Sequence, residues 1–498
     1  MLQKNSTASK VFSQWIPAVV IDVRSPHSYT VEFDDGSRRV LHANHLRKFY
    51  VRAQCVTYDT SLMTSTADVN SCVILNEQDN DFGEIVTFNG CTENQTKQRL
   101  PSQLINRETL AHLSVKQQNE LFQLLDNYAD CFSDLPGLTN RAEHSIQLMP
   151  GFKPKRLREY KVPERLRPEV ERQLDQMLAN GIVREFSSPM CSPLVLVPKG
   201  KDGCNGVRLA VDYRYVNSYT IPDAFPVPDI EDVIQRIGGK RYISLFDCRQ
   251  GYWMTEVREQ DRWLTAFVCL GRLLEFTRTP DGMKNSGQSF LRGIQAVLRP
   301  LRQFADSYVD DCAVFSDEWR YHMQDLEKFL CTIKGEGVTL NLAKCRFAQP
   351  FVNFCGEIVG SGLRRIDPEK VKAVQEIKNP ETKKQLRRVL GFFGYFRKFL
   401  NRFAEKAKVL TDLTAKRVPS NIKPLWKEQH SEALNDLKQE LIKASNDSLH
   451  MVRLDRPFDC YVDASSYAVS GLLLQKDENG TEYPIAFFSV KLNPTQQR

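Results

Sequence analysis

The stretch Tyr308-Val309-Asp310-Asp311 places two adjacent carboxylates between apolar, strand-forming residues. Residues 303–307 precede it, and Cys312-Ala313-Val314-Phe315 follow it. The pattern predicts a strand, a tight turn and a second strand, with the acidic pair at the exposed tip. Because an Asp-Asp pair is also ordinary turn chemistry, this stretch alone does not establish a functional site.

A third carboxylate, Asp247, ends another apolar run, Tyr242-Ile243-Ser244-Leu245-Phe246. Mg2+ prefers hard oxygen ligands, and one or two protein carboxylates together with substrate phosphates satisfy it. Three carboxylates at the ends of two strands are therefore suited to holding two Mg2+ ions against a triphosphate. The sequence predicts Asp247, Asp310 and Asp311 as catalytic residues and metal ligands.

Length and composition limit the class of protein. A chain of 498 residues is too long for one hydrophobic core and should contain about three to five domains. Its composition, 41% hydrophobic and 26% charged, is typical of a soluble globular protein. No apolar run approaches the roughly 18 residues of a membrane helix, and residues 1–10 lack the apolar core of a secretory signal. We therefore expect a cytoplasmic protein with no membrane partner.

The 13 cysteines are scattered singly, with no Cys-x-x-Cys pair and no Cys/His cluster at zinc spacing, so they are expected to be reduced thiols. The formal net charge of +7 is compatible with nucleic acid as a partner without establishing it.

Hydrophobic periodicity divides the chain into segments. Residues 11–50 alternate as in a small antiparallel sheet or barrel, and residues 51–105 are polar and aperiodic, which is typical of a linker. A helical stripe then runs from Leu166 to Leu178. Residues 192–198 and 207–214 favour two strands joined by a basic turn.

Two helix starts are also predicted. Ser316 is expected to cap a helix that carries Met323, Leu326 and Phe329. Thr382 and Gln385 form a capping box for a helix toward Phe396 and Leu400, on which Arg387, Arg388, Arg397, Lys398 and Arg402 also lie.

Five ordered motifs resemble those of the reverse transcriptases of gypsy-type retrotransposons and retroviruses. They are Phe246-Asp247-Cys248-Arg249-Gln250-Gly251-Tyr252-Trp253, residues 279–286 (Thr-Pro-Asp-Gly-Met-Lys-Asn-Ser), the Tyr-Val-Asp-Asp box, residues 340–345 and Phe354-Cys355-Gly356. Chance agreement of five motifs in the family's order is far less probable than agreement of one. The resemblance covers roughly residues 140–498.

The resemblance implies an α+β, right-hand polymerase with fingers, a palm formed by a helix-backed antiparallel sheet, and a thumb. The expected domains are a segment at 1–50 like the SH3-like C-terminal domain of integrases, a linker at 51–135, fingers and palm at 136–360, thumb and connection at 361–450, and a partial ribonuclease H-like domain at 451–498.

The implied activity is RNA-directed DNA synthesis on an RNA or DNA template with a primer, using dNTPs and two Mg2+ ions, for which Mn2+ can substitute. Other Pol and Gag products are further expected partners, with virus-like particles as the location within the cytoplasm. The alternative left open is a catalytically decayed, nucleic-acid-binding relic of a Pol polyprotein. A DNA or chromatin tether based on residues 11–50 is a third, weaker hypothesis.

By the same resemblance, further residues bind substrate. Arg208 matches an arginine that clamps the triphosphate, with Lys199 or Lys201 as the accompanying lysine. Tyr252 matches an aromatic gate against the sugar 2′-hydroxyl, and Lys344 a lysine proposed to protonate pyrophosphate. Gly282 belongs to the motif that lies against the nucleotide and template.

The remaining expectations concern departures and the C-terminal end. Asp311 is expected to be more peripheral than Asp310, because side chains of successive strand residues diverge. Asp281 stands where the family usually has glutamine or an aromatic residue, and a carboxylate near the triphosphate is electrostatically unfavourable. Asp463 resembles one metal ligand of ribonuclease H; the others are missing before Arg498, so ribonuclease H activity is not expected.

Overall fold

The computed structural model describes residues 2–4, 15–25, 28–33, 37–42, 46–47, 100–198, 206–493 and 495–496. The chain divides into two compact units, Met1–Glu77 and Gln78–Arg498. No helix in these ranges is both long and apolar enough to span a bilayer.

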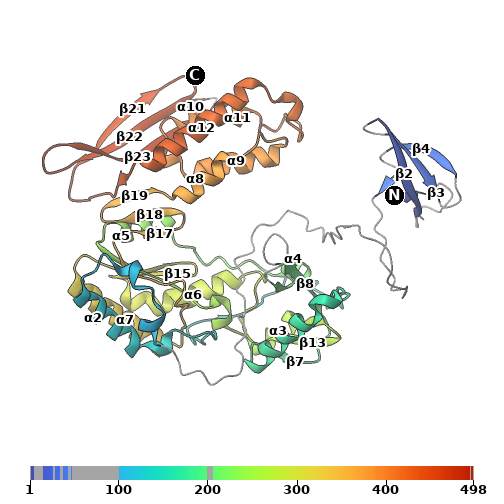
Figure 1. The fold of residues 1–498 in the computed structure, drawn as a ribbon, viewed down its shortest axis with the longest axis horizontal. Helices are drawn as coiled ribbons and strands as arrows, with labels where there is room; N and C mark the ends of the chain where they lie inside the picture. The colour runs from blue at the N-terminus through green and yellow to red at the C-terminus, as the bar shows by residue number, and fades with distance from the viewer. Residues whose placement is uncertain are drawn as a thin grey trace, which may run out of the picture. The chain divides into compact units, whose positions relative to one another are not determined.

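The N-terminal unit contains one antiparallel sheet with the strand order β4-β3-β2-β1-β5 (Figure 1). Its strands are β1 (Leu2–Lys4), β2 (Trp15–Ser25), β3 (Ser28–Phe33), β4 (Arg38–His42) and β5 (Leu46–Arg47). The antiparallel strands expected within residues 11–50 are present, and the relation to integrase stays a prediction.

The central sheet of the second unit has the order β14-β15-β10-β16. Its strands are β10 (Tyr242–Asp247), β14 (Ala305–Tyr308), β15 (Asp311–Ser316) and β16 (Arg346–Gln349). Cys312 and Val314 of β15 pack into one apolar cluster and Ala313 into another, because successive strand side chains point to opposite faces. Both faces of the sheet are therefore covered.

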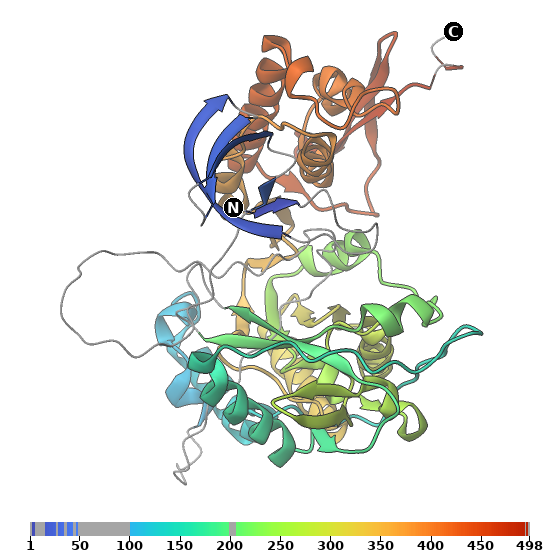
Figure 2. The same ribbon diagram turned by 90° about the vertical axis from the view of Figure 1, so that its right-hand side faces the viewer.

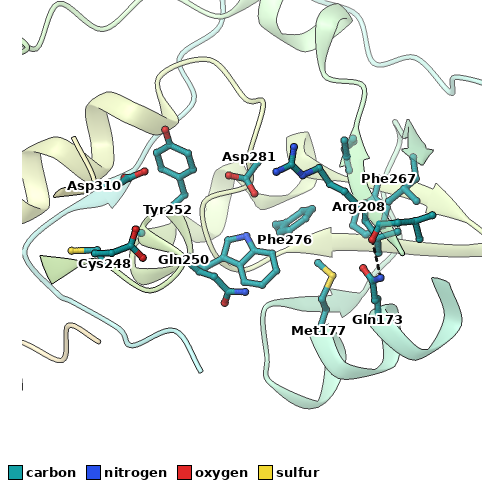
Figure 3. A pocket seen from close by; sticks show the side chains of 18 of the residues that line it. Gln173, Met177, Arg208, Cys248, Gln250, Tyr252, Phe267, Phe276, Asp281 and Asp310 are labelled. Atoms are coloured by element: carbon teal, nitrogen blue, oxygen red, sulfur yellow. Dashed lines mark hydrogen bonds between the residues drawn. The ribbon is translucent and has the colours of Figure 1, made fainter. Parts of the chain in front are cut away.

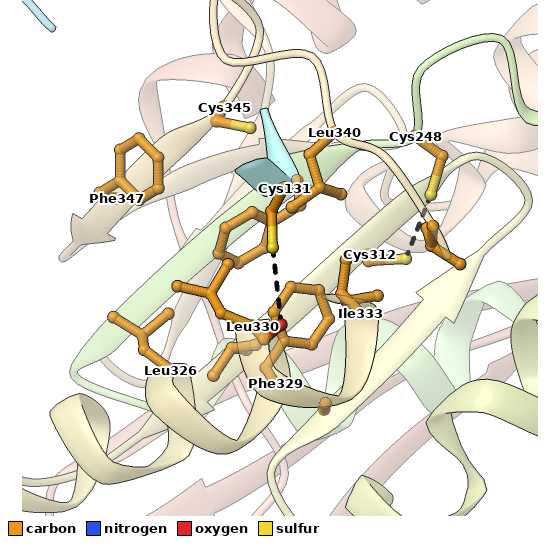
Figure 4. Packing of buried hydrophobic residues seen from close by; sticks show 14 of the residues in the cluster. Cys131, Cys248, Cys312, Leu326, Phe329, Leu330, Ile333, Leu340, Cys345 and Phe347 are labelled. Atoms are coloured by element: carbon orange, nitrogen blue, oxygen red, sulfur yellow. Dashed lines mark hydrogen bonds between the residues drawn. The ribbon is translucent and has the colours of Figure 1, made fainter. Parts of the chain in front are cut away.

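Two long helices, α6 (Ser286–Leu298) and α7 (Trp319–Gly335), contribute to the larger of these clusters. Figure 4 shows Leu326, Phe329, Leu330 and Ile333 of α7 in the same apolar cluster as the buried thiol of Cys312. The antiparallel sheet covered by α6 and α7 confirms the expected helix-backed palm.

The N-terminal boundary of this core was predicted wrongly. Residues 101–135 were assigned to the linker, but they contain α1 (Pro101–Leu104) and α2 (Val115–Asn127). Leu121 and Leu125 of α2 are fully buried in the palm cluster, and α2 lies beside α7 (Figure 1). Because the buried residues of α2 belong to the palm cluster, the helix is part of the palm. Residues 51–99 lie outside the described residues.

A second sheet has the order β7-β13-β12-β8-β9. Its strands are β7 (Val183–Glu185), β8 (Ser192–Pro198), β9 (Val207–Val211), β12 (Phe267–Cys269) and β13 (Arg272–Phe276). Helix α3 (Arg167–Ala179) buries Val170 and Leu174 against it. The predicted helix and hairpin are both confirmed, and the turn at 199–205 is outside the described residues.

The C-terminal part combines a small sheet, β17-β18-β19-β20, with a helical segment at residues 368–446. The strands are β17 (Val352–Phe354), β18 (Glu357–Gly360), β19 (Leu363–Ile366) and β20 (Leu449–His450), and the helices are α8 (Pro368–Gln375), α9 (Lys383–Tyr395), η8 (Arg397–Phe399), α10 (Phe403–Lys406), α11 (Lys408–Asp412), η9 (Lys423–Leu425) and α12 (Glu428–Asn446). Figure 2 shows this part at one end of the unit and the palm at the other.

A last antiparallel sheet, β21 (Asp459–Ala464), β22 (Ala468–Lys476) and β23 (Glu482–Lys491), follows the helical segment. The remaining short elements are η2 (Arg107–Leu110), η3 (Ala129–Cys131), β6 (Glu143–His144), η4 (Glu164–Leu166), α4 (Arg214–Tyr219), α5 (Ile230–Gly238), η5 (Gly251–Met254), β11 (Glu256–Val257), η6 (Glu259–Thr265) and η7 (Arg299–Leu301).

Candidate active site

The three predicted carboxylates meet at one end of the palm sheet. Asp247 and Asp311 are directly opposite each other in the antiparallel ladder of β10 and β15. Asp310 lies in the turn that joins β14 to β15, and its carbonyl oxygen accepts a 3.2 Å hydrogen bond from the Cys248 amide. Strand pairing therefore brings Asp247 to the same edge as the acidic turn.

The turn itself has an unusual backbone. Val309 has a φ of 53°, although β-branched side chains are disfavoured at positive φ. Such a conformation costs on the order of 1–3 kcal/mol and persists only where the surroundings impose it. Here Tyr308 pairs with Asp311 directly across the turn, so the flanking strands fix its geometry.

A cavity opens in front of two of these carboxylates (Figure 3). Asp247 and Asp310 line it from the palm, Arg208 lines it from β9, and Asp281 lines it from the segment between β13 and α6. Asp311 is exposed and is not part of the lining. Asp311 thus lies outside the cavity lining, although its Cα pairs with that of Asp247 across the ladder, and its peripheral role stays a prediction.

Lys344 is also placed at this cavity. Its Nζ lies 3.1 Å from Oδ2 of Asp247. The preceding backbone is anchored to the end of β10, because the Asn341 amide donates a 2.9 Å hydrogen bond to the Asp247 carbonyl. The lysine therefore balances the charge of Asp247 in this structure, a contact that the sequence did not indicate.

Asp281 lies between Tyr252 and Arg208 in Figure 3, with its carboxylate toward the guanidinium. Burial and the charge of Asp310, partly opposed by Arg208, together raise the pKa of Asp281 to about 7. The carboxylate flagged from the sequence is therefore inside the cavity, where its charge acts on the groups around it.

Tyr252 is held on η5 with its ring edge-to-face against Phe290 at 5.9 Å. The adjacent Gly251 permits this approach, since a Cβ there would lie 2.9 Å from the Phe290 ring and 3.2 Å from Oδ1 of Asp310. Tyr252 thus lines the cavity together with Asp310, and its role as an aromatic gate stays a prediction.

Sequence reasoning missed Gln250, which lines the cavity from a left-handed backbone position with φ 49°. Its side chain is 8% exposed, and its Oε1 has no hydrogen-bond partner among the described residues. A left-handed non-glycine residue next to a catalytic strand is a backbone feature, so the amino-acid letters gave no signal for it.

The other predicted substrate-binding positions have mixed outcomes. Gly282 is exposed with φ 77°, a value that favours glycine, and its carbonyl accepts a 2.8 Å hydrogen bond from Asn217. Lys199 and Lys201 lie outside the described residues.

The basic residues near α9 are not equivalent. Lys398 is ion-paired to two glutamates, Arg402 is ion-paired to Asp463 of β21, and Arg387 donates to the Thr414 carbonyl. Asp463 therefore faces a cation from the helical segment, and both partners of that pair are more than half exposed.

The donor set fits a hard divalent cation. Among the described residues, no three His, Cys, Asp or Glu side chains converge as a complete metal site. Two carboxylates facing an open cavity nevertheless suit Mg2+, which is commonly bound by one or two carboxylates and completed by substrate phosphates and water. The cation of Lys344 beside Asp247 shows that positive charge is accommodated there.

Comparison with known families identifies two conserved domains. The family model described as reverse transcriptase (RNA-dependent DNA polymerase) matches residues 197–391, and that of the RNase H-like domain found in reverse transcriptase matches residues 426–498.

Among curated proteins, the chain is similar to the Drosophila melanogaster retrovirus-related Pol polyprotein from transposon opus, with 36% identity over 350 residues. That match covers 68% of this chain and 34% of the relative. The Pol polyprotein from transposon gypsy of the same organism is 32% identical over 340 residues, covering 66% and 32%. The chain thus spans about a third of the length of these relatives.

Solved structures give the same relationship. The foamy viral protease-reverse transcriptase in complex with dsDNA superposes with a TM-score of 0.70 at 25% identity, covering 80% of this chain and 81% of that one. The same enzyme in complex with an RNA/DNA hybrid gives a TM-score of 0.66 at 25% identity, covering 80% and 52%. The right-hand polymerase fold is therefore confirmed.

Proposed function

Because this chain belongs to the reverse transcriptases of gypsy-type retrotransposon Pol polyproteins, we propose that it is an RNA-directed DNA polymerase that adds dNTPs to a primer 3′-hydroxyl. The observation that carries the proposal is the cavity in which Asp247 and Asp310 face Arg208. Carboxylates on one wall and a guanidinium on the other match the divalent cations and triphosphate that the reaction requires.

Asp247 and Asp310 are the proposed ligands of two Mg2+ ions, with Asp311 in a peripheral role; Mn2+ is a possible substitute. When bound, the ions activate the attacking hydroxyl and neutralise charge on the leaving pyrophosphate. Lys344, whose Nζ lies 3.1 Å from Oδ2 of Asp247, would neutralise this carboxylate when no cation is bound and give up the contact when a cation binds there.

Substrate contacts follow from the other cavity residues. Arg208 binds the triphosphate, aided by Lys199 or Lys201 of the adjacent turn, because a planar, permanently charged guanidinium suits phosphate. Tyr252, braced by Phe290, excludes a ribose 2′-hydroxyl and so favours dNTPs. Gly282 keeps the nucleotide-facing segment in its left-handed turn.

The primed nucleic acid is the proposed macromolecular partner, either an RNA or a DNA template with its primer. The solved complexes of the foamy viral enzyme, with dsDNA and with an RNA/DNA hybrid, support this partner. Other Pol and Gag products, and a cytoplasmic location within virus-like particles, are part of the same proposal.

The decisive experiment is Mg2+-dependent extension of an oligo(dT) primer on poly(rA), with wild type and Asp310→Asn in parallel. Loss of one ligand leaves the cations under-coordinated, so the variant should lose extension by at least about 100-fold, in line with barrier effects of several kcal/mol. Its melting temperature and primer–template affinity serve as controls for folding.

A second candidate is a catalytically decayed relic that binds nucleic acid. Asp281 in the cavity favours it, because it adds a third carboxylate where the triphosphate binds. A folded wild type that binds primer–template without extending it would establish the relic. Ribonuclease H cleavage by Asp463 is not proposed for this chain. The tether hypothesis is tested by deleting residues 1–50: unchanged retention of DNA by the shortened protein would refute it.

A further inference from the structure

Four charged side chains form a cluster at the boundary between the palm and the helical segment. Arg364 of β19 donates to Oε2 of Glu357 on β18 at 2.7 Å and to Oε2 of Glu231 on α5 at 2.8 Å. Lys398 of η8 lies 2.7 Å from Oε1 of Glu357 and also pairs with Glu231. Two carboxylates and two cations thus alternate in a closed set.

The cluster is shielded from water. The Glu357 side chain is fully buried, Arg364 is 9% exposed and Lys398 is 16% exposed, whereas Glu231 is 48% exposed. Charges in such surroundings are costly unless they are paired, and removing one partner leaves an uncompensated charge behind. The four side chains can therefore be buried together because their charges cancel.

The charged set joins two separate apolar clusters. Helix α5 packs Ile234 and Ile237 against palm residues such as Phe315. Phe399 of η8 belongs to the core of the helical segment, and both cations of the set lie over its ring, at 5.8 Å for Arg364 and 5.7 Å for Lys398. The set is thus the polar joint between the two cores.

The joint lies next to the catalytic turn through the β17–β18 hairpin. That hairpin turns at Cys355 and Gly356, whose φ values are 53° and 83°. Tyr395 of α9 donates a 2.7 Å hydrogen bond from its hydroxyl to the Cys355 carbonyl. Cys355 and Tyr308 pack against the same apolar cluster, and β18 begins at Glu357, two residues after Cys355.

We propose that Glu231, Glu357, Arg364 and Lys398 are positioning residues that hold the β17–β18 hairpin and the helical segment in a fixed relation to the catalytic turn, so that a bound primer end stays at Asp247 and Asp310. The inference rests on the proposed polymerase function. It assigns Lys398 an internal structural charge and not a contact with template–primer phosphates, which separates it from the other basic residues near α9.

Charge balance supplies the test. Lys398→Met leaves an excess negative charge in the set, and Glu231→Gln leaves an excess positive charge, whereas the double variant leaves Arg364 and Glu357 as a neutral pair. Each single variant should raise the Kd for primer–template by about tenfold, and the double variant should return to within about threefold of wild type. The single-turnover rate from the preformed, saturated complex should also fall in each single variant and recover in the double variant, because a displaced primer end reacts more slowly.

Lys406→Met is the matched control. Lys406 pairs with Glu440 at 2.8 Å, but both belong to the helical segment, on α10 and α12. This variant should leave the Kd within about twofold of wild type. The melting temperature of each of the four variants tests whether it is folded. Glu231→Gln is isosteric at a half-exposed position, so its Kd alone still tests the inference if Lys398→Met fails to fold.

Several outcomes would overturn the inference. They are additive effects of the two single changes on Kd, or an unchanged Kd in both single variants. Binding of primer–template is measured by fluorescence anisotropy without nucleotide, so the Kd values can be compared even if the wild type does not extend the primer. Failure of the wild type to extend the primer would refute the proposed polymerase function and leave the inference on the charge set open to this test.

Discussion

Asp281 places a third carboxylate, with a raised pKa, in the cavity proposed to bind the triphosphate. It shares the cavity with Asp247 and Asp310 and faces Arg208. At pH values above about 7 its carboxylate is charged, and it then repels a triphosphate and competes for the guanidinium. The same carboxyl is neutral below that pH and can donate a hydrogen bond.

We expect Asp281→Asn to lower the KM for dTTP at pH 8 by about fivefold, because removal of the charge relieves repulsion on the order of 1 kcal/mol. The gain should shrink at pH 6, where the wild-type carboxyl is largely protonated. Steady-state extension on poly(rA) at both pH values measures this. A KM that rises in the variant at pH 8 would show instead that the carboxylate contributes to substrate binding.

At the scale of elements, helix boundaries were predictable where a cap is written in neighbouring residues. Thr382 and Gln385 form the predicted capping box of α9. Ser316 was predicted wrongly as a cap: α7 begins at Trp319 after Glu318, and the Ser316 hydroxyl donates to Asp325. The hydroxyl thus bonds to a side chain farther along α7 and not to the backbone amides of the helix's first turn.

Helix α2 is an element of the palm, so truncating its buried face should destabilise the polymerase core. Leu125→Ala should lower the free energy of unfolding by about 2–5 kcal/mol, because Leu125 is fully buried in the palm cluster. Leu104→Ala is the matched control, since Leu104 is 53% exposed on α1. Equal urea midpoints for the two variants would show that α2 does not belong to the palm core.

At the scale of the whole molecule, two buried histidines link folding to pH. Burial lowers the pKa of His144 to about 4 and that of His322 to about 3. His322 shares hydrogen bonds with Ser244 and Ser316, and neither ring is exposed. An unfolded chain would protonate both rings near pH 6.5.

The unfolded state therefore binds more protons than the folded state between pH 6.5 and about 4, and stability must fall as the pH is lowered through that window. We expect wild type to lose about 1–2 kcal/mol per histidine between pH 7 and pH 5, and His322→Gln to lose less. Urea unfolding at the two pH values measures the loss. A variant with the same pH dependence as wild type would contradict the assignment to His322.

The sequence by itself determined the strands that end at Asp247 and Asp311 and the acidic turn before Asp311, because alternation of apolar residues and local turn chemistry lie in adjacent residues. The right-hand polymerase fold followed from the resemblance of five ordered motifs to a known family, and the solved structures confirm it. It predicted Asp247, Asp310 and Arg208 as site residues; all three line one cavity, and their roles stay predictions. Only the tertiary structure decided the left-handed Gln250, the pairing of Lys344 with Asp247, and the charge set of Glu231, Glu357, Arg364 and Lys398. The two charge contacts join residues that are distant in the chain, so they depend on how the elements pack and not on any local pattern. The backbone of Gln250 is likewise set by the fold around it.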